Sequence, residues 1–232
     1  MAAPTERLGP LVHRSVRHGA ILWIVGVVEF IVGMIVTQVG YTGTTYSLSA
    51  NYISDLGAAH CGNYHSGLYV CSPWHDVFNV AIILLGILLI FGTLLLWSAF
   101  RPRGTRTVGL LLLVISGIGA IGVGLSPEDV NLTVHTASAA TAFIGANLAL
   151  MVLSLAMFRD TRWDGYRTFT MVMGLIGLVA LVLFEEKVYG PLGVGGMERL
   201  IVAPVLLWAF VAAVHLVRIP TYAPTAIPHA PS

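Results

Sequence analysis

Charge is the scarcest ingredient of this sequence. Only 10% of its 232 residues are Asp, Glu, Lys or Arg, whereas a soluble domain carries about 25% charged residues. Hydrophobic residues make up 56% of the chain, and its mean hydropathy is +0.85. Too few charges remain to cover a surface that faces water on all sides. The formal net charge of +1 also provides no general basic surface, so we expect no nucleic-acid partner.

The chain also lacks the short alternating segments of a membrane β-barrel and the G-x-S-x-G motif of serine hydrolases. It contains instead six apolar runs, each near the roughly 20 residues with which a helix crosses a bilayer. Backbone groups in lipid must be bonded within their own segment, which favours helices. We therefore predict an all-α, polytopic six-helix transmembrane bundle. The predicted spans are Ala20–Val39, Val77–Phe100, Val108–Leu125, Val134–Phe158, Thr168–Phe184 and Leu200–Val217.

The basic residues are distributed unevenly around these spans. Ten of the 12 lie on the side that carries both termini, and only Lys187 and Arg199 lie on the other. The positive-inside rule then predicts a multi-pass protein of the cell membrane with both termini in the cytoplasm. Residues 1–19 would form a cytoplasmic segment and residues 20–218 the transmembrane domain, with an extracytoplasmic loop at 40–76. The Pro- and Ala-rich residues 219–232 are predicted to be a disordered tail.

Cysteine is nearly absent as well. The two cysteines, Cys61 and Cys71, both lie in the 40–76 loop. Because the extracytoplasmic side is oxidising in most cells, we predict a disulfide between them, with two free thiols as the alternative. A zinc site that adds His60 and His65 is a weaker alternative, since the spacing matches no compact zinc motif.

The same loop carries the polar stretch "YSLSANYISDLGAAH", residues 46–60. Ser47, Asn51, Ser54 and Asp55 would share one face if this stretch were a helix. We expect that face to turn toward the starts of the second and fourth spans, where it would form the wall or lid of a site.

Two of the spans begin with similar capping signals. Ser72 in "CSPWHDVFN" and Ser126 in "LSPEDVN" are predicted N-caps, each followed by a proline at the first helical position. Glu128 and Asp129 would then meet the positive end of the fourth helix. Farther into the membrane, the small residues of "GIGAIGVG" in the third span are expected to let helices approach closely.

Two histidines open the second and fourth helices at the same depth. His75 and His135 could bind a divalent metal such as zinc, with Asp55 or Asp76 as the third ligand. Such a metal could activate water against a lipid headgroup. In that case Asp55, His75, His135 and Glu198 would be catalytic. Alternatively, each histidine bonds a neighbouring carboxylate or carbonyl, and haem is disfavoured because its ligands usually lie deeper. The candidate substrate-binding residues are Ser47, Asn51, Ser54, Trp74 and Asn79.

A carboxyl group also lies near the centre of the first span. Glu29 in "WIVGVVEFIVGM" would be costly as an unpaired charge, so it should be protonated or paired. Asn147 in the fourth span is the partner that its depth favours, and Ser116 in the third span is another candidate. The acid could serve proton movement or lipid contact, or it could fix helix packing through one interhelical hydrogen bond.

Three stretches together point to a known family: "SANYISDLGA", "PWHDVFN" and "VHTASAATAF". With six spans, the chain resembles the prokaryotic membrane family filed as domain of unknown function nine-nine-eight, from the first helix to the sixth. That family is distantly similar to the Frag, DRAM and Sfk membrane proteins, several of which are linked to lipid remodelling. The resemblance implies a lipid-related role at the non-cytoplasmic face but no reaction. It maps onto Asn51, Ser54, Asp55, His75, Asn79 and His135.

Three functions are therefore compatible with the sequence. The first is a membrane-embedded lipid hydrolase or transferase, and the second is a non-catalytic lipid-binding or scaffold subunit. The third is a transporter of lipid or small molecules with Glu29 in its path, which the lack of an internal repeat disfavours. The expected partners are membrane lipid and either another membrane protein or a second copy of the chain.

Overall fold

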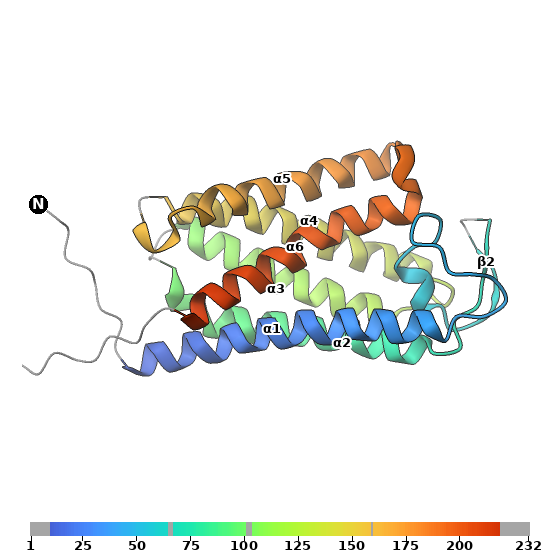
Figure 1. The fold of residues 1–232 in the computed structure, drawn as a ribbon, viewed down its shortest axis with the longest axis horizontal. Coiled ribbons are helices and arrows are strands. Elements are labelled where there is room, and N and C mark those ends of the chain that lie inside the picture. Colours follow the sequence, from blue (N-terminus) through green and yellow to red (C-terminus); the bar gives the residue numbers. More distant parts are fainter. Residues whose placement is uncertain (1–9, 65–66, 101–103, 159, 219–232) are drawn as a thin grey trace, which may run out of the picture.

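The computed structural model describes residues 10–64, 67–100, 104–158 and 160–218. In this part of the chain, six helices are long and apolar enough to cross a membrane, which confirms the predicted six-helix bundle. The helices run alternately up and down, so that α1 begins and α6 ends at the same end of the bundle (Figure 1). We call this the terminal end, and the opposite end, which carries residues 40–74, the loop end. The helices are α1 Pro10–Val39, α2 His75–Leu95, α3 Gly104–Leu125, α4 Leu132–Ala156, α5 Tyr166–Glu185 and α6 Gly193–Arg218.

Helix boundaries differ from the prediction mainly where polar residues continue a helix beyond its apolar run. α1 starts at Pro10, so residues 10–19 are helical rather than a separate segment. α6 starts at Gly193, well before the predicted Leu200, directly after the 3-10 turn η4 (Gly190–Leu192). Residues 1–9 and the tail predicted at 219–232 lie outside the described residues. Two further 3-10 turns lie at the terminal end, η2 (Trp97–Ala99) and η3 (Thr161–Trp163).

The helices pack in a ring in chain order, and α6 closes the ring against α1. Glycines set the distance between α2 and α3. A Cβ atom at Gly86 would lie 2.5 Å from the carbonyl oxygen of Gly117, and one at Gly117 would lie 2.8 Å from that of Gly86. The two backbones therefore touch, which is the role that we predicted for the small residues of the third span.

The half of the bundle nearest the terminal end has a solid core. Trp23 of α1 and Trp208 of α6 are fully buried, with ring centroids 5.3 Å apart. Nearer the terminal end, the rings of Phe100 and Trp163 stack with their centroids 4.8 Å apart. Fully buried leucines fill the space between these rings, namely Leu96, Leu110, Leu113, Leu150 and Leu153. Large side chains therefore block the bundle axis in this half.

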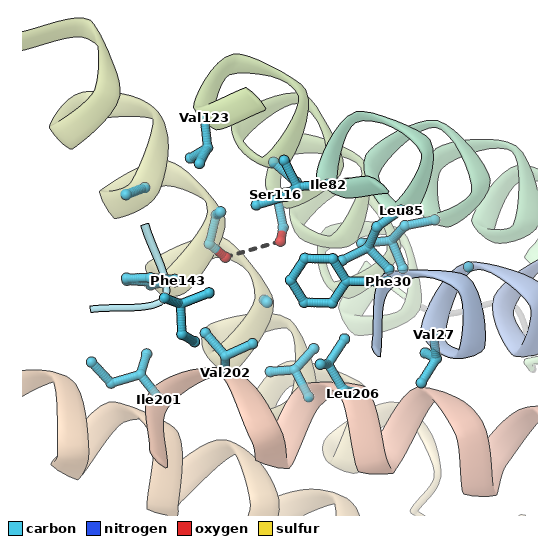
Figure 2. A pocket seen from close by; sticks show the side chains of 18 of the residues that line it. Val27, Phe30, Ile82, Leu85, Ser116, Val123, Phe143, Ile201, Val202 and Leu206 are labelled. Carbon is cyan, nitrogen blue, oxygen red and sulfur yellow. Dashed lines mark hydrogen bonds between the residues drawn. The ribbon is translucent and has the colours of Figure 1, made fainter. Parts of the chain in front are cut away.

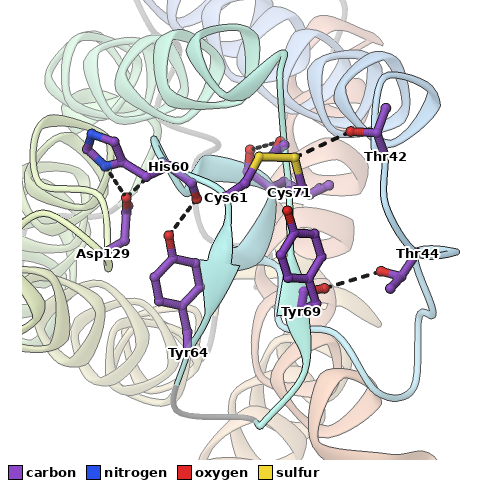
Figure 3. Close-up of a disulfide and its surroundings, with 10 residues drawn as sticks. Thr42, Thr44, His60, Cys61, Tyr64, Tyr69, Cys71 and Asp129 are labelled. Atoms are coloured by element: carbon purple, nitrogen blue, oxygen red, sulfur yellow. Dashed lines mark hydrogen bonds and ion pairs between the residues drawn. A yellow bond between two sulfur atoms is a disulfide. The ribbon is translucent and has the colours of Figure 1, made fainter.

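The loop end is covered by residues 40–74. They contain the 3-10 turn η1 (Ser54–Gly57) and a small antiparallel pair, β1 (Gly62–Asn63) with β2 (Tyr69–Val70). A disulfide joins Cys61 to Cys71 and closes this hairpin, as predicted (Figure 3). Thr42 donates a hydrogen bond to the sulfur of Cys71 and so ties the hairpin to the end of α1.

The prediction of a polar helix around residues 47–55 is wrong. One α-type turn forms there, in which the Asn51 N–H donates to the Ser47 carbonyl at 2.8 Å, and the only regular element in this stretch is η1. The Asn51 side chain explains the difference, because it accepts from the Ser47 N–H and donates to Asp55. Such side-chain bonds compete with helix formation.

Candidate functional site

A cavity occupies the loop-end half of the bundle, between α1, α2, α3, α4 and α6. It contains about 950 Å³ of space not filled by atoms, part of which is open to the surroundings, and most of its lining is apolar. Figure 2 shows side chains from these helices pointing into it, among them Phe30, Ile82, Phe143 and Leu206. Trp23, at the edge of the solid core, lines its deep end. Ile53 and Ser54, at the start of η1, line its loop end, which we call the mouth.

Few polar side chains line this cavity, and their positions are uneven. Ser54, His135 and Glu198 lie at the loop end, contributed by η1, α4 and α6. Ser116 and Asn147 lie farther down, and the hydroxyl of Ser116 donates to the Ala142 carbonyl at 2.9 Å. The cavity is thus polar at its mouth and apolar along its body.

Residues around the start of α2 hold η1 in place over the mouth. Ser72 donates a 2.7 Å hydrogen bond to the Leu56 carbonyl, and Asn79 donates a 3.0 Å bond to the Gly57 carbonyl. Trp74 precedes α2 at its N-cap position, and its side chain makes no capping bond. Ser72 is therefore not the N-cap that its Ser-Pro motif predicted, because its hydroxyl bonds η1 instead.

Asp55 is the most deeply buried carboxyl group, with 0% of its surface exposed. One oxygen, Oδ2, accepts from the Asn51 side chain at 2.7 Å and from the Tyr52 N–H at 3.2 Å. The Glu128 carboxyl lies close enough for its charge to act on that of Asp55, and we call these two groups the carboxyl pair. Burial, followed by the charge of Glu128, raises the pKa of Asp55 to about 7.

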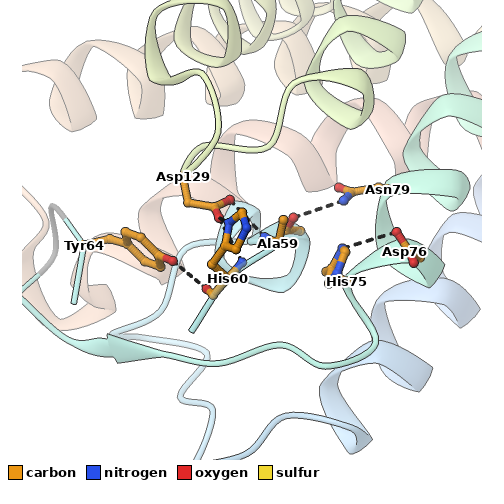
Figure 4. Close-up of polar contacts among 8 residues, drawn as sticks. Ala59, His60, Tyr64, His75, Asp76, Asn79 and Asp129 are labelled. Carbon is orange, nitrogen blue, oxygen red and sulfur yellow. Dashed lines mark hydrogen bonds and ion pairs between the residues drawn. The ribbon is translucent and has the colours of Figure 1, made fainter. Parts of the chain in front are cut away.

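Glu128 and Asp129 reach the covering loop and do not cap α4, so their predicted capping role is wrong. Ser54 donates to Glu128 Oε2 at 2.7 Å. Asp129 accepts from the N–H groups of Ala59 and His60, both at 2.9 Å, and lies 2.8 Å from the His60 ring (Figure 4). Burial acts to raise the pKa of Asp129, but these hydrogen bonds hold it below its ordinary value. Asn131 is the actual cap of α4 and accepts from the Val134 N–H.

The start of α6 fastens the same loop from the other side. Glu198, only 7% exposed, accepts a short hydrogen bond from the Ile53 N–H. Arg199 donates through Nη1 to the carbonyl oxygens of Leu48, Asn51 and Gly195, at 2.8–3.0 Å. Its Nη2 donates to the Tyr46 hydroxyl. Arg199 was not among the predicted site residues. Its position could have indicated a role, because it follows Glu198 and is one of only two basic residues predicted on that side of the membrane.

The two histidines have different surroundings. His135 is 8% exposed, lines the cavity, and bonds the Ser126 carbonyl through Nδ1 at 2.9 Å. His75 is half-buried and lies 3.3 Å from Asp76, whose side chain is 90% exposed. Figure 4 shows this pair apart from the Asp129–His60 contact. Among the described residues, no group of three His, Cys, Asp or Glu side chains could hold a metal ion. Asp55, His75 and His135 therefore do not assemble into the predicted metal triad.

The predicted substrate-binding residues also fall into different places. Ser54 lines the cavity, whereas Asn51 and Asn79 are buried supports of η1. Ser47 bonds Ser49 and the Ala50 N–H at the surface. Trp74 is exposed, and its ring packs over Gly40. Only Ser54 of this set is placed to touch a molecule in the cavity.

Glu29 and Asn147 do not pair, so that prediction is wrong as well. Asn147 donates to the carbonyl oxygens of Phe143 and Ile201, at 2.9 and 3.2 Å, and so joins α4 to α6. Glu29 is on α1, which packs against α2 and α6. It is not one of the residues that line the cavity, and its Oε1 has no hydrogen-bond partner among the described residues.

Comparison with known protein families gives a match. The model of a family described as "protein of unknown function (DUF998)" matches residues 24–215, which include every lining residue of the cavity except Trp23. No curated protein and no solved structure matches the chain significantly. The more distant similarity to the Frag, DRAM and Sfk proteins stays a prediction.

Proposed function

Since the chain belongs to the DUF998 family of proteins of unknown function, its function has to be argued from the site, and we propose that the protein binds a membrane amphiphile in the cavity. One observation carries this proposal: the polar lining residues Ser54, His135 and Glu198 gather at the loop end, while the rest of the lining is almost entirely apolar. An amphiphile has the same division between head and chain.

The position of the cavity supports this ligand class. The polar mouth lies beneath the loop that we expect on the extracytoplasmic side, because the basic residues gather at the opposite end. A lipid of the outer leaflet would then keep its usual orientation on entering, with its head at the mouth and its chain in the body.

Binding fits the arrangement better than transport does. A transporter must offer its substrate a path to the other side of the membrane, yet the terminal half is filled by Trp23, Trp208 and the buried leucines around them. Glu29, which was predicted to lie in such a path, does not line the cavity.

Binding also explains the carboxyl groups better than acid–base catalysis does. Asp55 is fully buried and is not a lining residue, so its proton is not in reach of a molecule in the cavity. Its bonds to the Asn51 side chain and the Tyr52 N–H instead stabilise the loop that covers the mouth. We assign Asp55 a positioning role and Glu198, Ser54 and His135 the contacts with the ligand head.

Photo-cross-linking would test this proposal. The full chain is reconstituted with phosphatidylcholine that carries a diazirine in its acyl chain, and the labelled peptides are mapped. We expect labels on cavity residues such as Val123, Phe143 and Leu206. Ala139→Trp, which places an indole in the cavity, should remove these labels. Ala137→Trp on the exposed side of the same helix is the matched control and should keep them. Labels confined to outward-facing residues in the wild type would overturn the proposal.

A further inference from the structure

The hydrogen-bond donors around the cavity are already used by the protein. Trp23 donates to the Leu89 carbonyl, Ser54 to Glu128, and Ser116 to the Ala142 carbonyl. Both amide hydrogens of Asn147 are taken by carbonyl groups. These are the described lining residues with N–H or O–H groups on their side chains, apart from His135 and the carboxyl of Glu198.

His135 follows the same pattern. Its Nδ1 lies 2.9 Å from the Ser126 carbonyl oxygen, which can only accept, so Nδ1 carries the hydrogen. In the neutral ring Nε2 is then an acceptor. Within the described residues Nε2 makes no hydrogen bond, and the ring lines the cavity. It is therefore available to a ligand as an acceptor.

Glu198 adds a buried carboxyl group to this set of acceptors. One of its oxygens accepts from the Ile53 N–H, and the other makes no hydrogen bond among the described residues. The carboxyl pair of Asp55 and Glu128 lies behind the same mouth, since Glu128 bonds the lining residue Ser54. No described lining residue is Lys or Arg, and the nearby Arg199 is committed to three backbone carbonyls and Tyr46.

We infer that the cavity selects amphiphiles with a positively charged, hydrogen-donating head, such as a protonated primary amine, over those with a phosphate head. This inference rests on the proposed function and adds the chemistry of the head. An ammonium group has three hydrogens and no acceptor, and the mouth offers three acceptors, Glu198, His135 Nε2 and Ser54 Oγ. A phosphate would meet no Lys or Arg and no uncommitted hydroxyl, amide or indole donor among the described lining residues.

Competition among matched heads tests the inference. The full chain in phosphatidylcholine nanodiscs is cross-linked as above, in the presence of dodecylamine, dodecyltrimethylammonium, dodecanol or dodecyl phosphate at equal membrane mole fraction. Dodecylamine should suppress the cavity labels at a concentration about tenfold lower than dodecyl phosphate does, because charge-assisted hydrogen bonds are roughly twice as strong as neutral ones. Dodecyltrimethylammonium, which has the charge without the hydrogens, should compete less well than dodecylamine.

A carboxyl substitution locates the effect. Glu198→Gln keeps the shape of the side chain and should remove the preference for dodecylamine. Glu186→Gln makes the same substitution at an exposed position of the loop end and should preserve the preference. If Glu198→Gln does not fold, the ranking of the four amphiphiles in the wild type still decides the question.

The outcomes separate the two proposals. Equal or stronger competition by dodecyl phosphate overturns the inference about the head while leaving the amphiphile site in place. If cavity labels are absent from the start, or if none of the four amphiphiles suppresses them, the amphiphile site itself is wrong and the inference falls with it.

Discussion

Ser54 donates a 2.7 Å hydrogen bond to Glu128, a residue 74 positions away in the chain. This contact joins the wall of the cavity to the carboxyl pair behind it, because Ser54 lines the cavity and the charge of Glu128 acts on Asp55. The protonation of a fully buried group is thereby linked to the position of the residue that meets the ligand. The stability of the loop end should consequently depend on pH.

Asp55→Asn should reduce the pH dependence of stability. The pKa of Asp55 is raised from 3.8 to about 7 in the folded protein, so the folded state holds this proton more tightly than the unfolded state does. The stability that this proton contributes is complete below the unfolded pKa and is lost as pH rises through the folded one. We expect the wild-type melting temperature in detergent to fall between about pH 4 and 7, and the Asp55→Asn profile to be flatter across that range.

The matched control is Asp76→Asn, which removes a carboxyl group that is almost fully exposed. Its melting profile should run parallel to that of the wild type. If Asp55→Asn also ran parallel, the proton would not be held by Asp55, and the link between the carboxyl pair and the loop would have to be abandoned.

The bundle itself could be predicted from the sequence because its signals are local and strong. Long apolar runs specify membrane helices, and glycines at helical spacing specify close contacts such as the one between Gly86 and Gly117. The predicted helix ends were less accurate, because a polar stretch can continue a helix beyond its apolar run. α1 and α6 show this, since they begin at Pro10 and Gly193.

The site could be predicted only in part. Ser54, Asp55, His135 and Glu198 were identified as polar residues at the loop end, and all four are buried there. Their roles were not predictable, because these depend on contacts between distant segments. The motif before α4 fits a helix start in its local sequence, yet Glu128 bonds the covering loop. The helical spacing of residues 47–55 was likewise misleading, since side-chain hydrogen bonds shape that stretch.

Gly117→Ala should destabilise the bundle. The new methyl group would lie 2.7 Å from a side-chain carbon of Ile90 and 2.8 Å from the Gly86 carbonyl oxygen, so α2 and α3 would have to separate. Overpacking of this kind costs about 1–3 kcal/mol. Thermal unfolding in detergent measures the loss. Gly104→Ala is the same substitution in the same helix with no atom within 4 Å of the new group. Equal melting temperatures for the two variants would contradict the close approach.

Reduction of the Cys61–Cys71 disulfide should lower stability and report the orientation of the chain. The bond closes a separation of 10 residues, for which chain entropy gives about 2.7 kcal/mol. We expect a lower melting temperature after treatment with reductant. Because the chain has no other cysteine, a membrane-impermeant maleimide should label intact cells only after reduction. Labelling that required permeabilised cells would place the loop end in the cytoplasm and reverse the predicted topology.

Arg199→Lys should loosen the cover of the cavity although it keeps the charge. The guanidinium bonds Leu48, Asn51 and Gly195 through one nitrogen and Tyr46 through another, a forked geometry that one ammonium cannot reproduce. Hydrogen bonds to charged groups contribute about 1.5–3 kcal/mol each. We expect a loss of about 2 kcal/mol, which lowers the melting temperature by roughly 4–8 °C for a chain of this size.

Hydrogen exchange locates the effect of Arg199→Lys. It should accelerate in residues 46–57 and stay unchanged in the helices of the solid core. Lys187→Gln, at an exposed position of the neighbouring connection, should leave exchange in residues 46–57 as it is in the wild type. Unchanged exchange in Arg199→Lys would mean that Arg199 does not hold the loop, which would then depend on its bonds to Ser72, Asn79, Asp129 and Glu198.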